Sequence, residues 1–487
     1  MRYFKSLHYA MLTLGSLCLN SAYATSTTLH RLSDSEMSAT TGQALLSMSY
    51  IAPTDARNLE SQRSDGDPNL GFYRLGMEAE LELNANIKKL QLGCGGMNGA
   101  GGCDIDIDHL SLSGISDTRE GRAGSSAKLT NPFIEFAIQN PNQASTRNVV
   151  GLRLSAEKVL GLLTLGTENS STANGINSLS GYMKVRSGIG DTELERSKIK
   201  GYANTAAQYM SLATYPIEGR LIANVLVDLA DADFRTNGGG FSIPEMNNLP
   251  FENPQIVVNG KRNSSIGLNA TVNIPTIHLG TGGDYPASGR TTSDANGTTT
   301  AVYTAGNPVD AVITGCRNLT LAPTCLVAWE GRQFSNIKMS GSVSGAKATV
   351  NFQEALGFIH RLEINSAASL SLQNQNILWP DSDTTNIAQS GWWLALQDPV
   401  SIGRVEPTQR LSIEPLLGQF ATKAGDYLKQ NPARTSDLLG VLTGSGLDAD
   451  IGKVDLSNVA PLQMNLSNLQ LNGQNFTPNC YGSLSFC

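Results

Sequence analysis

The chain has 487 residues, of which 35 are Lys or Arg and 42 are Asp or Glu, so its formal net charge at pH 7 is −7. An acidic chain without a dense Lys or Arg cluster repels a phosphate backbone, which excludes nucleic acid as the expected partner. Charged residues make up only 16% of the chain while Gly alone numbers 49, a balance that favours an exported β-rich protein over a cytosolic enzyme.

Residues 1–24 have the pattern of a secretory signal peptide. Arg2 and Lys5 precede an apolar run from Ala10 to Leu19, and Ala22-Tyr23-Ala24 places small residues where a signal peptidase reads. Removing this leader leaves 33 basic and 42 acidic residues, a net charge of −9. We expect the mature chain to be exported, to the periplasm, the outer-membrane surface or the extracellular space.

Residues 25–45 predict one short capped helix. Ser33 and Glu36 have the spacing of a capping box, and Leu32 and Met37 that of a hydrophobic staple. Gly42 provides a residue that can end this helix.

A short pattern of one apolar residue, two spacers and two further apolar residues one apart occurs five times. Strands bury alternate residues, so two adjacent polar spacers predict that the buried face changes sides at that point. The pattern indicates long antiparallel strands and therefore a mainly β fold, either a sandwich or an elongated curved sheet. Its copies begin at Ile87, Ile107, Ile274, Phe334 and Leu466.

The first two copies predict a hairpin closed by a disulfide. If Cys94 faces Cys103, apolar residues meet apolar residues along both strands. The same register brings the two spacer pairs opposite each other, with Lys89 facing Asp108. The expected pairs are Leu92 with Ile105, Leu90 with Ile107, Ile87 with Leu110, Ala85 with Leu112 and Gln91 with Asp106.

A second, related module is predicted to start near Ser265, because alternation resumes there and Gly280-Thr-Gly-Gly283 mirrors Gly93-Cys-Gly-Gly96. The copy that begins at Phe334 supplies its returning strand, and Pro275 indicates an edge or a bulge. We therefore expect a first β module at 46–236, a second with a long disulfide-bearing loop at 237–375, and a C-terminal part at 376–487.

Helices are expected to be few. Ser412 to Gln430 carries one apolar stripe and stops at Asn431-Pro432, which predicts an amphipathic helix. This helix either packs on a sheet as a core element or lies in a groove that otherwise holds acyl chains. Ala156 to Leu163 and Asn204 to Leu212 are weaker helix candidates.

The six cysteines beyond the leader form three local couples, Cys94/Cys103, Cys316/Cys325 and Cys480/Cys487. Each couple brackets a turn-rich segment, so near-neighbour disulfides are favoured, which indicates an oxidising compartment. Their spacings of nine, nine and seven do not match the short spacings of zinc sites.

Catalytic motifs are not evident, and we predict no enzyme and no cofactor. Asp228, Asp231 and Asp233, and separately Asp448 with Asp450, are weak candidates for calcium ligands in turns. Trp379, Trp392 and Trp393 surround a turn-rich segment and could stack on sugar rings or anchor a partner. Alternatively, Trp392 and Trp393 start a strand that ends at Leu396, with one ring in the core and one at the sheet edge.

Residues Leu32 to Leu45, continuing through Ser47 to Pro53, resemble the start of an uncharacterised group of exported proteins of Gram-negative bacteria. Some members of this group are described as Fil-type pilus-assembly or filament-associated proteins. The resemblance implies a surface or periplasmic structural role, and it brings no catalytic residues.

The sequence therefore predicts a non-enzymatic component or accessory of a cell-surface filament or envelope assembly. Free strand edges would contact other envelope or filament proteins by strand addition. Two alternatives stay open, a periplasmic carrier of lipids or other amphiphiles and a sugar-binding adhesin that uses the three tryptophans.

Overall fold

The protein is a mainly β structure with few helices, as the sequence predicts. The computed structural model describes residues 46–167, 172–186, 198–224, 228–281, 286, 288–317, 330–402, 407–436 and 446–467. The expected signal peptide at 1–24 and the expected helix at 25–45 lie outside these residues. None of the helices within the described ranges is long and apolar enough to span a membrane.

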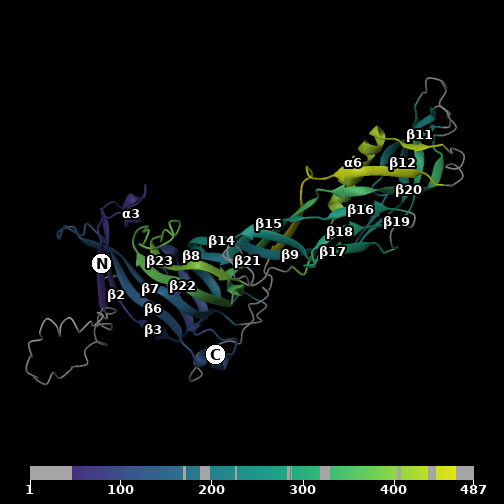
Figure 1. The fold of residues 1–487 in the computed structure, drawn as a ribbon. Helices are drawn as coiled ribbons and strands as arrows, with labels where there is room; N and C mark the ends of the chain where they lie inside the picture. Colours follow the sequence, from purple (N-terminus) through teal and green to yellow (C-terminus); the bar gives the residue numbers. More distant parts are fainter. Residues whose placement is uncertain are drawn as a thin grey trace, which may run out of the picture. The chain divides into compact units, whose positions relative to one another are not determined.

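An 11-stranded sheet, here the first sheet, combines strands from residues 46–186 with three strands from residues 256–263, 361–373 and 391–401 (Figure 1). Its main path runs β1-β2-β6-β7-β22-β23-β8-β5-β4, with β3 on β6 and β14 on β8. The strands are β1 (Leu46–Ile51), β2 (Leu70–Met77), β3 (Glu80–Leu83), β4 (Ala85–Leu92), β5 (Ile105–Ser113), β6 (Ala127–Gln139), β7 (Asn148–Thr164), β8 (Ile176–Arg186), β14 (Ile256–Asn263), β22 (Arg361–Gln373) and β23 (Gly391–Ser401). Helices α3 (Leu59–Gln62) and α4 (Arg119–Ala123) lie in its connections.

The first sheet returns on itself. Strand β5 pairs with β8 through Ile105 to Ile107 and with β7 through Ser111 to Ser113. The pairings β7-β22-β23-β8-β5-β7 therefore form a closed circuit. Because a closed circuit of strands cannot be flat, this sheet has a concave face.

A second sheet has ten strands in the order β17-β18-β16-β20-β19-β12-β11-β25, with β10 on β12 and β26 on β20. They are β10 (Gln208–Ser211), β11 (Glu218–Asn224), β12 (Asp228–Ile243), β16 (Thr276–Gly280), β17 (Arg290–Ser293), β18 (Thr299–Tyr303), β19 (Ala305–Cys316), β20 (Gln333–Ser344), β25 (Ala433–Thr435) and β26 (Asp448–Asp455). Helix α6 (Glu414–Gln430) contacts β11 and β26 of this sheet.

Two three-stranded sheets complete the described fold. The third sheet is β13-β9-β24, from β9 (Lys198–Thr205), β13 (Leu249–Pro254) and β24 (Arg410–Leu411). The fourth sheet is β15-β21-β27, from β15 (Ser265–Asn273), β21 (Lys347–Ala355) and β27 (Leu462–Ser467).

Helix α6 confirms the amphipathic helix predicted at Ser412 to Gln430. It has Pro415 in its first turn and ends at Asn431, and its buried residues include Leu416, Phe420 and Leu428. The two weaker helix candidates are wrong, because Ala156 to Leu163 lies in β7 and Asn204 to Leu212 spans the end of β9 and β10. Pairing of β7 with β6 and β22 along both edges outweighs its helical periodicity.

Strand pairing crosses the expected module boundaries. Strand β22, expected in the second module, lies between β7 and β23 of the first sheet, while β12 pairs with β19 in the second sheet. The run that starts at Ser265 splits at Pro275, so that β15 pairs with β21 and β16 pairs with β20. The returning strand β20 is the predicted one. Of the two strands β15 and β16, only β16 pairs with it, because Pro275 has no N–H to continue a ladder from one into the other.

Candidate functional site

The concave face of the first sheet contains an apolar cavity of about 490 Å³. Nine strands of this sheet supply its lining, and the helix α6 supplies none of it. The lining residues are Leu46, Leu75, Gly76, Met77, Leu81, Leu90, Ile105, Leu110, Leu112, Leu129, Pro132, Phe133, Ile134, Leu154, Ser155, Ala156, Val159, Leu163, Ile364, Ala368, Ser369, Leu370, Leu394 and Leu396.

One apolar row crosses six neighbouring strands of this face. The row follows directly from the register, since each member is the cross-strand partner of the next. It reads Met48, Leu75, Ile134, Leu154, Leu370 and Leu394 on β1, β2, β6, β7, β22 and β23. Because side chains on one face of a sheet lie at alternate positions, these residues share the concave face.

Several of these side chains are exposed although they are large and apolar. Leu75 is 46% exposed, Leu154 is 47% exposed and Met48 is 82% exposed. Contiguous exposed apolar surface of this kind is uncommon on monomeric proteins and marks binding sites. The cavity is therefore the first candidate for a functional site.

The lining has no chemistry for catalysis. Among the described lining residues only Ser155 and Ser369 are polar, and none is titratable. Ser155 Oγ donates a hydrogen bond to the Ala368 carbonyl oxygen at 3.0 Å. The cavity can bind an apolar ligand, but these side chains cannot supply a general acid or base to it.

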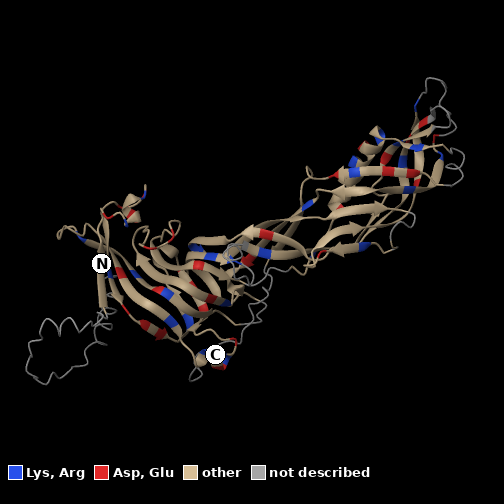
Figure 2. Cartoon of the chain, in the orientation of Figure 1, with Lys and Arg blue, Asp and Glu red and all other residues tan. Residues whose placement is uncertain are grey.

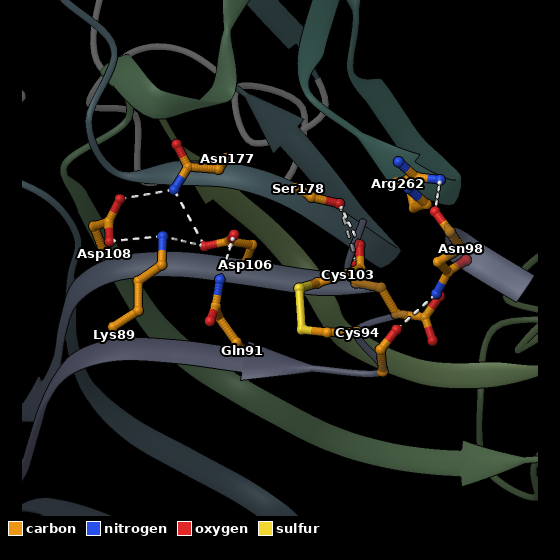
Figure 3. Close-up of a disulfide and its surroundings, with 12 residues drawn as sticks. Lys89, Gln91, Cys94, Asn98, Cys103, Asp106, Asp108, Asn177, Ser178 and Arg262 are labelled. Atoms are coloured by element: carbon orange, nitrogen blue, oxygen red, sulfur yellow. Dashed lines mark hydrogen bonds and ion pairs between the residues drawn. A yellow bond between two sulfur atoms is a disulfide. The ribbon is translucent and has the colours of Figure 1, made fainter. Parts of the chain in front are cut away.

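The hairpin β4–β5 forms one wall of the cavity and confirms the predicted register. Every expected pair is present, from Leu92 with Ile105 to Ala85 with Leu112, including Lys89 with Asp108 and Gln91 with Asp106. Cys94 and Cys103 form the predicted disulfide beyond the end of the ladder (Figure 3).

A polar network covers the outer side of this hairpin (Figure 3). Lys89 Nζ lies 2.6 Å from Asp106 Oδ1 and 3.0 Å from Asp108 Oδ1, and Asn177 of β8 donates to both carboxylates. Burial opposes ionisation of Asp106, but hydrogen bonds from Lys89, Gln91 and Asn177 outweigh it and lower the pKa of this carboxyl. The network joins β4, β5 and β8 on the face that points away from the cavity.

The sequence pattern predicts that the buried face changes sides at the two spacer residues. This prediction is wrong, because the apolar side chains before and after the spacers stay on one face. His109 has φ 47°, in the left-handed region. The pairs on either side of it, Ile87 with Leu110 and Lys89 with Asp108, keep one register, so both strands reset their alternation at this point without an extra residue. Ile105 before it and Leu110 after it therefore line the same cavity. Asn336, with φ 64°, also resets the alternation on β20, where Phe334 and Ile337 are both buried and the register with β19 shifts, as at a β-bulge. Two copies of the pattern thus contain a left-handed residue that keeps the apolar side chains on one face.

The three tryptophans lie on the first sheet or against its outer face. Trp392 and Trp393 begin β23 as expected, and Trp379 packs against Phe72 of β2. Trp379 and Trp393 are 3% and 1% exposed, and the Trp393 ring N–H donates to Asn386. Two of the three indole rings are thus buried away from any ligand, and Trp392 is half-buried.

A buried ion pair beneath the Trp379 segment could not be recognised from the sequence. Arg153 of β7 contacts Glu135 of β6 and donates to the Pro380 carbonyl oxygen at 2.9 Å. Arg74 of β2 also contacts Glu135, at 3.2 Å. These charges alternate with the apolar cavity residues along their strands, and only the fold shows that the segment after β22 covers them.

The weak calcium candidates are not brought together. Asp231 pairs with Arg220 and Asp233 with Arg317, while Asp450 accepts a hydrogen bond from the Gly452 N–H. Asp448 is exposed, and the side chain of Asp228 is outside the described part. Within the described ranges no three His, Cys, Asp or Glu residues are grouped as metal ligands would be.

The remaining predicted disulfides fall mostly outside the described residues. Cys316, at the end of β19, is disulfide-bonded, and its expected partner Cys325 lies outside them. Cys480 and Cys487 also lie outside the described ranges.

Helix α6 does not lie in the large cavity. Its apolar face packs on the second sheet, where Leu416, Leu417 and Phe420 contribute to a small cavity of about 30 Å³. Of the two readings of this helix, the core element is the one that its burial supports.

Comparison of the chain with protein-family models, with curated proteins and with solved structures gave no match. The candidate site therefore rests on its own geometry, an uncharged apolar cavity in a curved sheet.

Proposed function

We propose that this protein binds the acyl chain of a lipid or a related amphiphile in the concave cavity of the first sheet. The observation that carries the proposal is the apolar row that crosses six strands and stays partly exposed. A volume of about 490 Å³ falls within the range of small-molecule sites, about 300–1,000 Å³.

The uncharged lining narrows the ligand class. A charged group transferred into this cavity would lose its hydration without finding a partner there, at a cost of several kcal/mol. An acyl chain has no such cost. The polar head of the amphiphile therefore stays at the open side of the cavity, and the chain occupies it.

The magnitudes agree with reversible binding. Each buried methylene contributes about 0.8 kcal/mol, so twelve contribute roughly 10 kcal/mol. Association costs at least about 4 kcal/mol. The remaining 6 kcal/mol or so corresponds to dissociation constants of tens of micromolar, which suits a carrier that takes up and releases its ligand.

Binding of a fluorescent fatty acid, 11-(dansylamino)undecanoic acid, tests the proposal. We expect fluorescence enhancement with the purified protein and displacement by dodecanoate roughly ten times more effectively than by decanoate, because two methylenes differ. Leu154→Glu should weaken probe binding at least tenfold. Leu160→Glu is the matched control, since Leu160 is a similarly exposed residue of the same strand outside the cavity lining.

Two outcomes would contradict the proposal. One is the absence of any enhancement by the wild-type protein, together with no acyl-bearing mass in native mass spectrometry after mild purification. The other is an equal loss of binding in Leu154→Glu and Leu160→Glu. The filament or envelope-assembly role, the exported location and the lack of an enzymatic activity stay predictions beside this proposal.

A further inference from the structure

The outer face of the fourth sheet carries three rows of uncharged residues, all of them polar except Gly267. The middle row consists of Asn269 on β15, Asn351 on β21 and Asn465 on β27, which are cross-strand partners. On one side of it lie Gly267, Gln353 and Ser467, and on the other Thr271, Thr349 and Gln463. The alternate residues of the same strands, such as Leu268, Phe352 and Leu466, are buried.

The strands of the first and second sheets carry interspersed acidic and basic residues (Figure 2), whereas on this face the first charged residue is Lys347, one row beyond Thr349. In the first sheet Lys128 pairs with Glu80, and in the second Arg317 pairs with Asp233. None of the nine positions in the three rows is charged. Within these nine positions, amide and hydroxyl groups are therefore the only side-chain hydrogen-bonding groups.

Some side-chain amides of this face are hydrogen-bonded to each other, and others are available to bond a ligand. Asn351 Nδ2 donates to Asn465 Oδ1 at 2.8 Å and to Gln463 Oε1 at 3.1 Å, which fixes the Asn351 side chain. Within the described part of the chain, the Asn269 side chain and Asn465 Nδ2 have no hydrogen-bond partner. Donors and acceptors therefore face solvent at the strand spacing of about 4.8 Å.

Asn351 and Asn465, but not Gln463, line a hollow of about 550 Å³. Its lining also includes Leu268, Phe352 and Leu466. Gly267 keeps its floor open, since a β-carbon there would meet only the Phe352 carbonyl oxygen, at 3.9 Å. The hollow also contains Asn269, Gln353 and Ser467. Without charge it offers nothing specific to anions or metal ions, while its amides can both donate to and accept from hydroxyl groups.

We infer that this amide face is a binding site for a neutral polysaccharide. Hydroxyl groups of sugars match the paired donors and acceptors of Asn and Gln, and their lack of charge matches the lack of charge on the face. This site is separate from the proposed acyl cavity, with which it shares no lining residue.

Affinity electrophoresis of the full chain in native gels tests the site. Dextran, amylose and hydroxyethylcellulose are the probes, and anionic alginate is the comparison. We expect retardation by at least one neutral polymer and not by alginate. Gly267→Val should weaken the retardation at least fivefold, because the new side chain fills the hollow while its extended backbone suits Val. Asn269→Asp should weaken it similarly.

Thr271→Val is the matched control, since Thr271 lies on the same face of β15 but outside the hollow. Its retardation should equal that of the wild type. No retardation of the wild type in any neutral gel would overturn the inference, as would equal retardation of Gly267→Val and wild type. A molecular mass that rises with protein concentration, and no longer does so in Gly267→Val, would assign the face to a second copy instead. Acyl-probe binding by Gly267→Val should stay unchanged. The proposals for the acyl cavity and for the polysaccharide site are thus tested separately.

Discussion

The first and second sheets differ in what covers their apolar faces. Both present an apolar face, but helix α6 packs on the second sheet and leaves a cavity of only about 30 Å³. On the first sheet no described helix occupies the concave face, and about 490 Å³ stays open. Alternating apolar residues make both faces, so the pattern of a strand does not reveal whether its apolar side will be filled. The open face is where a ligand can bind.

The largest expected effect is a difference in stability loss between side chains on the apolar face that α6 covers and side chains on the open face of the first sheet. Phe420→Ala in α6 should lower the free energy of unfolding by about 3–5 kcal/mol, because Phe420 is buried and its removal leaves a cavity. Leu154→Ala should cost less than about 1 kcal/mol, since its side chain already faces open space. Urea unfolding of both variants measures the difference, and similar losses would break the comparison.

Removal of the Cys94–Cys103 disulfide should destabilise the wall of the open sheet. The bond closes a loop with a sequence separation of nine residues, for which loop-closure entropy gives about 2–3 kcal/mol. In the Cys94→Ser/Cys103→Ser double variant, hydrogen exchange should accelerate in β4 and β5 and stay unchanged in α6. Faster exchange in α6 would show that the two sheets do not respond separately. Reduced wild-type protein is the control.

The two left-handed residues, His109 and Asn336, should behave alike in both sheets. His109→Val and Asn336→Val should each lower the free energy of unfolding by about 1–2 kcal/mol, because a β-branched residue is disfavoured at positive φ. His109→Gly should be neutral or stabilising by up to about 1 kcal/mol. Urea unfolding checks all three variants. A harmless His109→Val would mean that this residue does not reset the alternation.

The smallest expected effect concerns the outer cover of the first sheet. Hydrogen bonds from Lys184, then from Thr385, hold the pKa of Asp383 well below its ordinary range. The folded-state pKa therefore lies below the unfolded value of about 3.9, so the carboxylate stabilises the fold above that pH and its contribution is lost as the pH falls.

Asp383→Asn should thus lower the free energy of unfolding at pH 7 by at most about 1 kcal/mol, given the partial exposure of this pair. The difference from wild type should shrink when urea midpoints are compared at pH 3. Asp65→Asn, at an exposed turn residue, is the control. A difference that grows at pH 3 would contradict the assignment.

Local patterns predicted the β4–β5 hairpin in full, because the disulfide, the apolar pairing and the spacer positions all depend on neighbouring residues in one ladder. Helix α6 was predictable for the same reason, as its stripe and its end lie within one segment. The pattern around His109 was visible in the sequence, but the left-handed conformation of this residue was not. Pro275 itself indicated a break in the run that starts at Ser265. The sequence did not indicate that the two resulting strands belong to two different sheets.

The amino-acid sequence by itself determined the mainly β class, the β4–β5 hairpin and helix α6, since propensity, alternation and cysteine spacing act over a few residues. Only the tertiary structure decided what lies on each apolar face. Pairing of β22 with β7 joins residues about two hundred positions apart, and closure through β5 curves the first sheet around its leucines. A pattern of alternation cannot contain this information, because burial of an apolar face depends on distant segments that share no local signal with it.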